Sequence, residues 1–287
     1  MVFVNQKGGV GKTTSAINIG AYLAKEGKKT LLVDFDSQAN LSGGTGIKPL
    51  KPGVYELISG VASINDVIRK TAVEKLHVIP ASIDLSGAAV ELIEQEERDF
   101  FLKNALAPVR DAYDYILIDC PPSLGVLTLN GMVAADSIII PMQCEYFAME
   151  GLSLLLQTIK RIQRGINPRL IIEGIFFTMY DPRTRLAQDV VKQVSAYFKD
   201  KVFKTIIPRN IRLSEAPSFG MPILQYDPQC PGAKAYHSLA QELIQRGTLS
   251  GHSRTARQAQ PGSPDNEPAE PSPAEKTGKI KGETNGA

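Results

Sequence analysis

Residues 5–14 read Asn-Gln-Lys-Gly-Gly-Val-Gly-Lys-Thr-Thr, and this stretch decides the fold. Its glycines can bring backbone N–H groups together around phosphate oxygens, and a helix starting at Lys12 would add the partial positive charge of its amino end. Lys12 is expected to reach the β and γ phosphates of a bound nucleotide, and Thr13 to offer a hydroxyl ligand to Mg²⁺. The stretch predicts a nucleotide phosphate loop made of Lys7, Gly8, Gly9, Val10, Gly11, Lys12, Thr13 and Thr14.

The same stretch departs from the common phosphate-loop pattern at one position. Gln6 stands where the ordinary Walker A pattern has glycine, and an additional lysine, Lys7, opens the loop. These features match the deviant pattern Lys-Gly-Gly-X-Gly-Lys-Ser/Thr. The flanks supply the context that the motif requires, because an apolar run precedes it and a helical pattern follows from about Lys12 to Lys25, ending at Gly27.

Short apolar runs recur along the chain between helical patterns. Near-continuous apolar strands that alternate with helices are typical of a parallel sheet covered on both faces. The sequence therefore predicts an α/β fold with a doubly wound, mostly parallel sheet flanked by helices on both faces, as in P-loop NTPases of the deviant Walker A type. The strands are expected at 1–5, 30–35, 76–81, 115–119, 137–142, 170–177 and 202–208.

Acidic residues end two of these strands. Asp119 closes one, at a position from which a carboxylate can hold Mg²⁺ through a water at the carboxyl edge of the sheet. Asp34 and Asp36 end another, where strand alternation would place both carboxylates on one side, near the phosphates. One of the two can orient or activate the attacking water. Because Asp is also common at strand ends as a cap, that structural alternative stays open for Asp36 and Asp119.

Overall charge and cysteine content exclude several classes of protein. A formal net charge of +2 over 287 residues gives no global electrostatic signature, so contact with nucleic acid would need a local basic patch. Cys120, Cys144 and Cys230 lack the spacing of a disulfide framework or a zinc site, which favours a cytoplasmic location. No apolar run approaches the roughly 18 residues of a membrane span, so a soluble protein is expected.

The composition changes after Arg246. Residues 248–287 are rich in Gly, Ser, Pro, Glu and Lys and contain almost no large apolar side chain. Burial in such a segment cannot offset the entropy lost on ordering it. We therefore expect residues 1–247 to form the nucleotide-binding domain and residues 248–287 a disordered polar tail.

Several segments together resemble the ParA/Soj family of deviant Walker A ATPases, which are relatives of MinD and of the nitrogenase iron protein. The likeness covers about residues 2–246 and includes the stretch quoted above. Ser37 departs from it, standing where the family usually has proline. The other segments are LLVDFDSQAN (31–40), YILIDCPPSLG (115–125), PMQCEYFAMEGLS (141–153), TMYDPRTRLAQDVV (178–191) and VFKTIIPRNIRLSEAPSFGMPILQYDP (202–228).

The resemblance implies a slow, partner-stimulated ATPase that uses ATP and Mg²⁺. Lys7 would act from one subunit of an ATP-bound homodimer on the phosphates held by the other, Asp36 would be needed for hydrolysis, and Pro208 would lie near the adenine. Catalysis would thus depend on Lys7, Lys12 and Asp36. The resemblance also implies non-specific binding of double-stranded DNA, a ParB-like centromere-binding partner, segregation of chromosome or plasmid DNA, a nucleoid-associated location and no membrane contact.

The densest basic cluster outside the phosphate loop falls within and just before the last of these segments. Acidic residues are sparse from 201 to 213, and neither a helix-turn-helix signature nor an aromatic-rich stacking element accompanies the cluster. Contacts to DNA phosphates without sequence preference are therefore expected. The candidate DNA-binding residues, called the 199–212 patch below, are Lys199, Lys201, Lys204, Arg209 and Arg212.

Three other functions share parts of this pattern. A nucleotide-gated regulator of transcription or replication initiation would carry the same phosphate residues, so the sequence leaves that alternative open. A MinD-like positioning ATPase resembles a chain ending in an amphipathic basic helix, whereas Leu249 and Ile280 are the only large aliphatic residues of the tail. An iron–sulfur protein needs paired cysteines, and Cys120 and Cys144 are better interpreted as small core residues.

Overall fold

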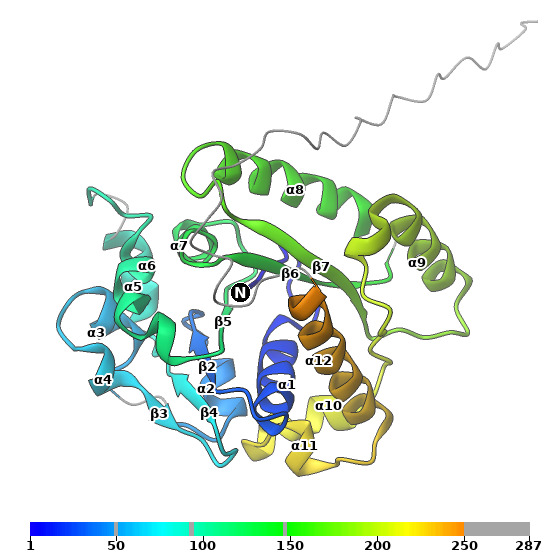
Figure 1. Ribbon diagram of the computed structural model, residues 1–287, viewed down its shortest axis with the longest axis horizontal. Helices are drawn as coiled ribbons and strands as arrows, with labels where there is room; N and C mark the ends of the chain where they lie inside the picture. The colour runs from blue at the N-terminus through cyan, green and yellow to red at the C-terminus, as the bar shows by residue number, and fades with distance from the viewer. Residues whose placement is uncertain (49–50, 92–94, 146–147, 250–287) are drawn as a thin grey trace, which may run out of the picture. The chain divides into compact units, whose positions relative to one another are not determined.

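The computed structural model describes residues 1–48, 51–91, 95–145 and 148–249 (Figure 1). Within these ranges, seven strands form one sheet in the order β3-β4-β2-β5-β1-β6-β7, and all pairings are parallel except that of β3 with β4. This arrangement confirms the predicted fold class. The strands are β1 (Val2–Phe3), β2 (Thr30–Asp34), β3 (Arg69–Lys70), β4 (Leu76–Ile79), β5 (Tyr115–Asp119), β6 (Ser137–Gln143) and β7 (Ile171–Thr178).

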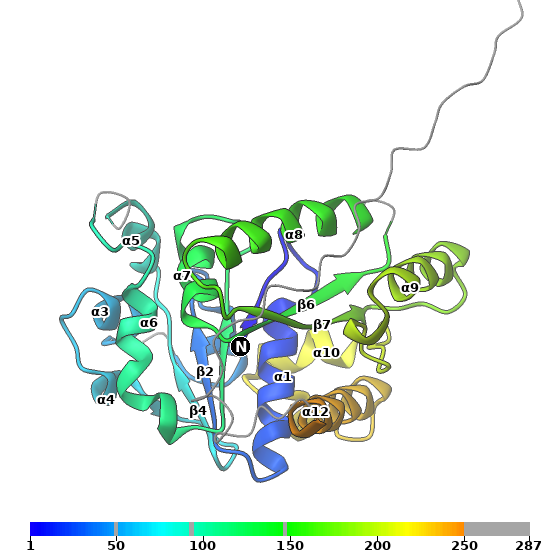
Figure 2. The same ribbon diagram turned by 45° about the horizontal axis from the view of Figure 1, so that its top comes forward.

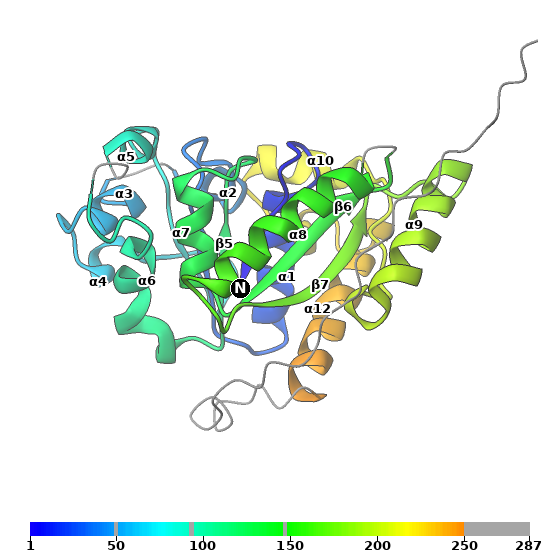
Figure 3. The ribbon, with the colours of Figure 1, turned by 90° about the horizontal axis from the view of Figure 1, so that it is seen from above.

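Helices cover both faces of the sheet (Figures 1 and 2). Helices α7 and α8 lie on one side of β6 and β7, while α1 and α12 lie on the other. Seen from above, α3 to α6 gather at one end and α9 lies at the opposite end (Figure 3). The helices are α1 (Lys12–Lys25), α2 (Asn40–Gly44), α3 (Val54–Ile58), α4 (Ile64–Val67), α5 (Leu85–Glu91), α6 (Phe101–Leu106), α7 (Val126–Ala134), α8 (Ala148–Arg164), α9 (Arg185–Phe198), α10 (Arg212–Glu215), α11 (Ile223–Tyr226) and α12 (Pro231–Leu249), with 3₁₀ turns η2 (Ala107–Ala112), η3 (Lys199–Lys201) and η4 (Ala216–Phe219).

Helix α1 has the bounds that the sequence predicts. It carries a nearly continuous buried surface and packs in one hydrophobic cluster with α12, through residues such as Ile17 and Tyr236. Gly20 permits close contact with the sheet, since a Cβ there would lie 2.6 Å from a methyl carbon of Leu32. The helix ends as expected before Gly27, whose N–H donates to Ala24 O at 2.9 Å. This packing fixes the helix whose amino end follows the phosphate loop.

The predicted strand at 202–208 is wrong, because this segment makes only isolated bridges to β7 and the residues after it. Val202 pairs with Ile175 and Pro208 with Tyr180. Between them, the N–H groups of Lys204 and Thr205 donate to the carboxylate of Glu242 on α12, at 2.8 and 3.0 Å. Since these donors are directed away from β7, a regular ladder cannot form. The short antiparallel β3 went unpredicted because two residues carry no periodic pattern.

Residues Met1–Arg246 form one compact unit. Apart from Thr248 and Leu249 at the end of α12, the predicted tail at 248–287 lies outside the described residues. Within the described ranges, none of the helices combines the length and the apolar character needed to cross a membrane. Cys120 and Cys230 are buried and Cys144 is half-buried, all three with free thiols.

Candidate phosphate-binding site

The predicted phosphate loop joins the carboxyl end of β1 to the amino end of α1. Gly9 and Gly11 have φ angles of 72° and 86°, in the left-handed region that other residues rarely adopt, so glycine is required at both positions. The first helical hydrogen bond runs from Ser15 N to Gly11 O at 2.9 Å. The loop therefore has the backbone shape that phosphate binding at a helix amino end needs.

Side chains at the ends of β6 and β7 hold this loop from the side. Gln143 Nε2 donates to Gly9 O at 3.1 Å, and Thr178 Oγ1 donates to Val10 O at 2.8 Å. Asn5 Nδ2 donates to a carbonyl of β6 at 2.8 Å. The loop is thus fastened to two neighbouring strands as well as to β1 and α1.

The two loop lysines point to different partners. Lys12 is 6% exposed, and its ammonium donates to Asn5 O at 3.1 Å and to Lys7 O at 3.3 Å. Burial lowers the pKa of Lys12, an effect opposed by the nearby carboxylate of Asp119. Lys7 is instead about half exposed and forms an ion pair with Glu145, which follows β6. The inner lysine is therefore buried within its own loop, whereas the outer one is exposed and pairs outside the loop.

Asp119 is a buried carboxylate at the end of β5. It is 1% exposed, and neither of its oxygens has a hydrogen-bond partner of normal geometry. Burial, together with the charge of Asp34, raises the pKa of Asp119 to about 8, while the Thr13 hydroxyl and Lys12 act in the opposite direction. Leaving such a group unpartnered costs free energy, so an unsatisfied buried carboxylate needs an explanation.

The residues present fit a bound Mg²⁺. Thr13 and Asp119 offer oxygen atoms, and magnesium is usually held by one or two protein oxygens together with phosphate oxygens and waters. No group of three or more His, Cys, Asp or Glu side chains able to hold a metal occurs among the described residues. The two unpartnered oxygens of Asp119 are the observation that fits this interpretation.

The two acidic residues near the end of β2 differ in environment. Asp34 is fully buried and accepts bonds from the N–H and hydroxyl of Ser42 at 2.8 and 2.6 Å. Ser42 Oγ in turn accepts from Ala81 N at 3.1 Å. Asp36 is only half-buried and accepts from Gln38 N at 3.0 Å. The two carboxylates were expected to lie on one side of a continuing strand, but β2 ends at Asp34, so this arrangement does not occur. Of the two carboxylates, only that of Asp36 is accessible to water.

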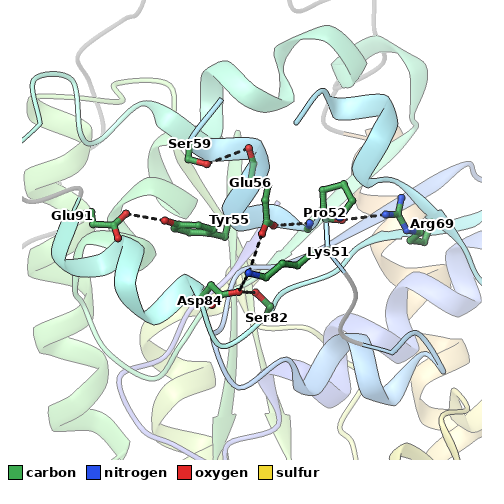
Figure 4. A network of polar contacts seen from close by, with 10 residues as sticks. Lys51, Pro52, Tyr55, Glu56, Ser59, Arg69, Ser82, Asp84 and Glu91 are labelled. Atoms are coloured by element: carbon green, nitrogen blue, oxygen red, sulfur yellow. Dashed lines mark hydrogen bonds and ion pairs between the residues drawn. The ribbon is translucent and has the colours of Figure 1, made fainter. Parts of the chain in front are cut away.

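A polar network anchors the segment that follows α2 (Figure 4). Lys51 Nζ lies 2.8 Å from Asp84 and 3.9 Å from Glu56, whose other oxygen accepts from Gly53 N. These contacts join the start of α3 to the residues before α5. Arg69 donates to Pro52 O at 3.1 Å, and the Tyr55 hydroxyl donates to Glu91 at 3.1 Å.

An open pocket of about 430 Å³ borders the first turn of α1. It is formed between α1, the segment around α2 and η4. The sequence pattern did not indicate it, because its walls come from three segments far apart in the chain. Its lining residues are Thr13, Thr14, Ile17, Ala39, Asn40, Gly43, Gly44, Pro217 and Ser218.

Pro208 lies at the same edge of the sheet as the phosphate loop. Its bridge partner Tyr180 comes two residues after Thr178, the side chain that holds Val10. Bonds from Tyr180 N to Ile207 O and from Arg209 N to Tyr180 O, each 3.0 Å, fix the backbone on both sides of the proline. The position is compatible with a contact to a nucleotide on the loop.

The residues of the 199–212 patch are all exposed but differ in their partners. Arg212 lies 2.9 Å from Glu215 and 3.5 Å from Asp227, so two carboxylates balance its charge. The pKa of Asp181 is lowered mainly by its hydrogen bonds with Arg183, and the charge of Arg209 adds a smaller effect in the same direction. The three lysines of the patch take part in none of the ion pairs found among the described residues.

Sequence reasoning missed the side chains that support the loop. Gln143 and Glu145 end or follow β6, which is adjacent to β1, Thr178 ends β7, the next strand of the sheet, and Ser42 reaches Asp34 from α2. The carboxyl ends of parallel strands meet at one edge, so polar residues ending β6 and β7 were a usable signal. The bond between Ser42 and Asp34 had no such signal, because it depends on how α2 packs.

Comparison with known proteins places the chain in a family. A family model described as an AAA domain matches residues 1–172. The chromosome-partitioning ATPase Soj of Treponema pallidum is 65% identical over 246 residues, covering 86% of this chain and 97% of that protein. The sporulation initiation inhibitor protein Soj of Bacillus subtilis is 52% identical over 249 residues, covering 86% and 98%.

A solved structure agrees with this placement. The crystal structure named cobyrinic acid a,c-diamide synthase from Mycobacterium smegmatis, with bound ADP and magnesium, has a TM-score of 0.76 and 38% sequence identity, covering 87% of this chain and 95% of that chain. The alignments with the Soj and ParA relatives cover 87% to 98% of the length of those proteins. The chain therefore belongs to the Soj/ParA family of chromosome-partitioning ATPases.

Proposed function

We propose that the chain is a MgATP-dependent switch that dimerises when it binds ATP, then binds double-stranded DNA without sequence preference, and is reset by hydrolysis. With a ParB-like partner it would segregate chromosome or plasmid DNA, as a nucleoid-associated protein of the cytoplasm. The observation that carries the proposal is the unpartnered, buried Asp119 carboxylate beside Thr13 and Lys12, at the mouth of a glycine loop. The names of the Soj and ParA relatives supply the biological setting.

The residues of the site divide the work of ATP hydrolysis. Mg²⁺ bound by Thr13 and, through a water, by Asp119 would neutralise charge on the β and γ phosphates. Lys12 would exchange its two carbonyl partners for phosphate oxygens, which are stronger acceptors for an ammonium. Asp36 would orient the attacking water, since its carboxylate is more accessible than that of Asp34.

The proposed dimer gives Lys7 a function that Lys12 does not have. Lys7 faces outward, so its ammonium can reach a second copy of the chain only after leaving Glu145. Within one subunit, Pro208 would contact the base of the nucleotide. We further propose that residues 1–247 carry these activities and that residues 248–287 are a dispensable tail.

Two substitutions separate binding from turnover. Lys12→Ala should abolish MgATP binding, dimer formation and DNA binding together, whereas Asp36→Ala should keep all three and lose hydrolysis. Fluorescent-nucleotide titration, light scattering with MgATP, and phosphate release measure these steps. Lys25→Ala, at the exposed end of the same helix, is the matched control. Tight ATP binding by Lys12→Ala, or normal turnover by Asp36→Ala, would contradict the proposal.

A second candidate function is supported by one relative. The Bacillus subtilis protein is named a sporulation initiation inhibitor, so a nucleotide-gated regulator of gene expression or replication is the alternative. The two functions differ in turnover. Hydrolysis stimulated by DNA together with a ParB-like protein would support segregation, whereas unstimulated hydrolysis with nucleotide-dependent binding to a regulatory protein would support the alternative.

A further inference from the structure

The carboxyl end of α8 carries an unusual concentration of positive charge. Residues 151–172 contain four basic residues and no acidic residue. All four basic side chains are exposed. We call this group the α8 surface, and its members are Lys160, Arg161, Arg164 and Arg169.

These cations lack the partners that most other arginines have. None of the ion pairs found among the described residues includes a member of the α8 surface. By contrast, a carboxylate lies within 4.0 Å of Arg98, Arg110, Arg183, Arg185, Arg212 and Arg246. The three arginines of the α8 surface are therefore free to bind an external anion.

The helix dipole explains only part of this cluster. Cations in the last turn of a helix are stabilised by the partial negative charge at its carboxyl end, by about 0.3–1 kcal/mol each. That effect would account for Arg161 and Arg164, which lie in the last turn of α8. It does not account for Arg169, which lies beyond the helix, nor for the absence of acidic residues throughout 151–172.

The α8 surface lies near the first part of the 199–212 patch. Arg169 is two residues before β7, and η3 packs beside the amino-terminal half of the same strand. A Cβ on Gly174 would lie 2.9 Å from Lys201 O, and Val202 is bridged to Ile175. Arg169 thus precedes β7 and Lys201 lies beside the middle of the same strand, with Glu173 and Asp200 as the nearby acidic residues in the sequence.

The character of the α8 surface favours a duplex over other polyanions. No aromatic residue occurs from 148 to 175, so bases of a single strand would find no stacking partner. Leu154 is the one large apolar side chain from 151 to 172 that is among the exposed ones, which is too little apolar surface to enter a bilayer. Lys160 and Arg164 are separated by about 6 Å along the helix axis, which suits contacts to successive phosphates of a rigid backbone.

We propose that the α8 surface is a second contact for the phosphate backbone of double-stranded DNA, adjacent to Lys199 and Lys201 of the 199–212 patch. This inference rests on the proposed DNA binding by the ATP-bound dimer. Each subunit would then present two groups of cations to one duplex. Arginine is suited to this role because its guanidinium group can donate two hydrogen bonds to one phosphate.

A pair of charge reversals tests the proposal. In Arg161→Glu/Arg164→Glu, DNA affinity of the MgATP-bound protein should fall at least about tenfold, and the salt slope of log affinity should become shallower by about 2 or more. ATP hydrolysis without DNA and the melting temperature should not change. Surface-bound duplex of random sequence, titrated at several salt concentrations, supplies the measurement. Arg161→Gln/Arg164→Gln should show the same direction with a smaller loss.

The matched control is Lys70→Glu/Lys75→Glu, which makes the same change in net charge at the opposite edge of the sheet, around β3 and β4. It should retain nearly wild-type DNA affinity. Equal losses in both double variants would show that only net charge matters and would overturn the inference. Wild-type affinity and slope in the α8 double variant would also overturn it.

Two further probes separate the other polyanions. The first probe is phosphatidylglycerol vesicles, and the second is soluble poly-glutamate. If either binds the wild type but not the α8 double variant, while both proteins bind DNA equally, the ligand of the α8 surface is a membrane or an acidic protein. That result would overturn the inference. If the wild-type MgATP form does not bind DNA at all, the proposed function fails, and this inference fails with it. Wild-type binding with no effect of α8 reversal contradicts the inference alone.

Discussion

The ends of β2 and β5 lie side by side yet treat their carboxylates in opposite ways. Asp34 and Asp119 are register partners in adjacent parallel strands, and both are almost completely buried. Ser42 donates two hydrogen bonds to Asp34, whereas Asp119 has no partner of normal geometry. Burial raises both pKa values, to about 6 for Asp34 and to about 8 for Asp119.

The difference separates a structural carboxylate from one available to a ligand. Asp34 joins β2 to α2 and, through Ser42, to the residue after Pro80, so its hydrogen-bonding capacity is used within the fold. Asp119 keeps its oxygens unpaired next to Thr13 and Lys12. Strand-end position alone would not distinguish the two, but their hydrogen bonds do. The first three predictions below test this distinction, and the fourth tests the backbone of the loop that follows β2.

The largest effect is expected from Asp119→Asn. Affinity for MgATP should fall at least about 100-fold, equivalent to roughly 3 kcal/mol, because the acidic oxygen that holds Mg²⁺ is lost. Affinity for ATP in EDTA should change by less than about threefold. Calorimetric titration with and without Mg²⁺ makes the comparison, with Asp34→Asn as the matched control. Equal losses in the two variants would abolish the distinction between the strand ends.

The pH dependence of stability should differ between the same two variants. A carboxyl group whose folded pKa lies above its unfolded value of 3.8 stabilises the fold fully below pH 3.8, and this contribution disappears as the pH rises through the folded pKa. For Asp34 the loss falls between about pH 4 and 6 and is worth roughly 3 kcal/mol. For Asp119 it continues to about pH 8.

Relative to the wild type without nucleotide, Asp34→Asn should therefore gain stability from pH 4 to 6 and then level off. Asp119→Asn should continue to gain up to about pH 8. Urea unfolding at half-unit pH intervals gives the two difference curves. Curves that level off at the same pH would show that the two carboxylates do not differ as described.

Ser42→Ala tests the bonded carboxylate from its partner's side. The variant removes the hydroxyl that donates to Asp34 and accepts from Ala81 N, leaving buried groups unsatisfied. We expect a loss of about 2 kcal/mol in unfolding free energy at pH 7. Thr13→Val, which alters the neighbourhood of Asp119, should cost much less stability but weaken Mg²⁺-dependent binding. Denaturant midpoints and MgATP titrations of both variants decide this.

The smallest expected effect concerns the loop after β2. Ala39 has φ 52°, a left-handed conformation that costs a residue with a Cβ about 1–2 kcal/mol relative to glycine. Ala39→Gly relieves this strain in the folded state, but glycine also gains freedom in the unfolded chain, which offsets part of the gain. We therefore expect the free energy of unfolding to stay equal or to rise by up to about 1 kcal/mol. A melting temperature clearly below the wild-type value would refute this account of the loop.

The sequence predicted those features that local pattern controls. The bounds of α1 and the parallel order of alternating strands and helices are confirmed, because apolar periodicity and the glycine loop determine them directly. The error at 202–208 arose because its apolar pattern is that of a strand, while Glu242, far along the chain, takes two of its N–H groups. Such long-range competition for donors leaves no local signal.

The candidate site shows the same division. Positions of Lys12, Thr13 and Asp119 follow from the motif and from strand ends, and their roles stay predictions. The environments of Asp34 and Asp36 could not be read from the sequence, because alternation assumes a strand that in fact ends at Asp34. The pairing of Lys7 with Glu145 likewise depends on the position of the loop after β6.

Glu242 also bears on how the protein avoids self-association. An exposed strand edge offers unpaired N–H and C=O groups on which another chain can add a strand and aggregate. Beyond β7 the N–H groups of Lys204 and Thr205 are already occupied by the Glu242 carboxylate, and the segment bends at Lys204, which is exposed. At the other edge, β3 is two residues long and reads Arg69-Lys70. Both edges of the sheet are thus poor templates for cross-strand pairing, an advantage for a protein that, in the function proposed above, meets other copies of itself through a different surface.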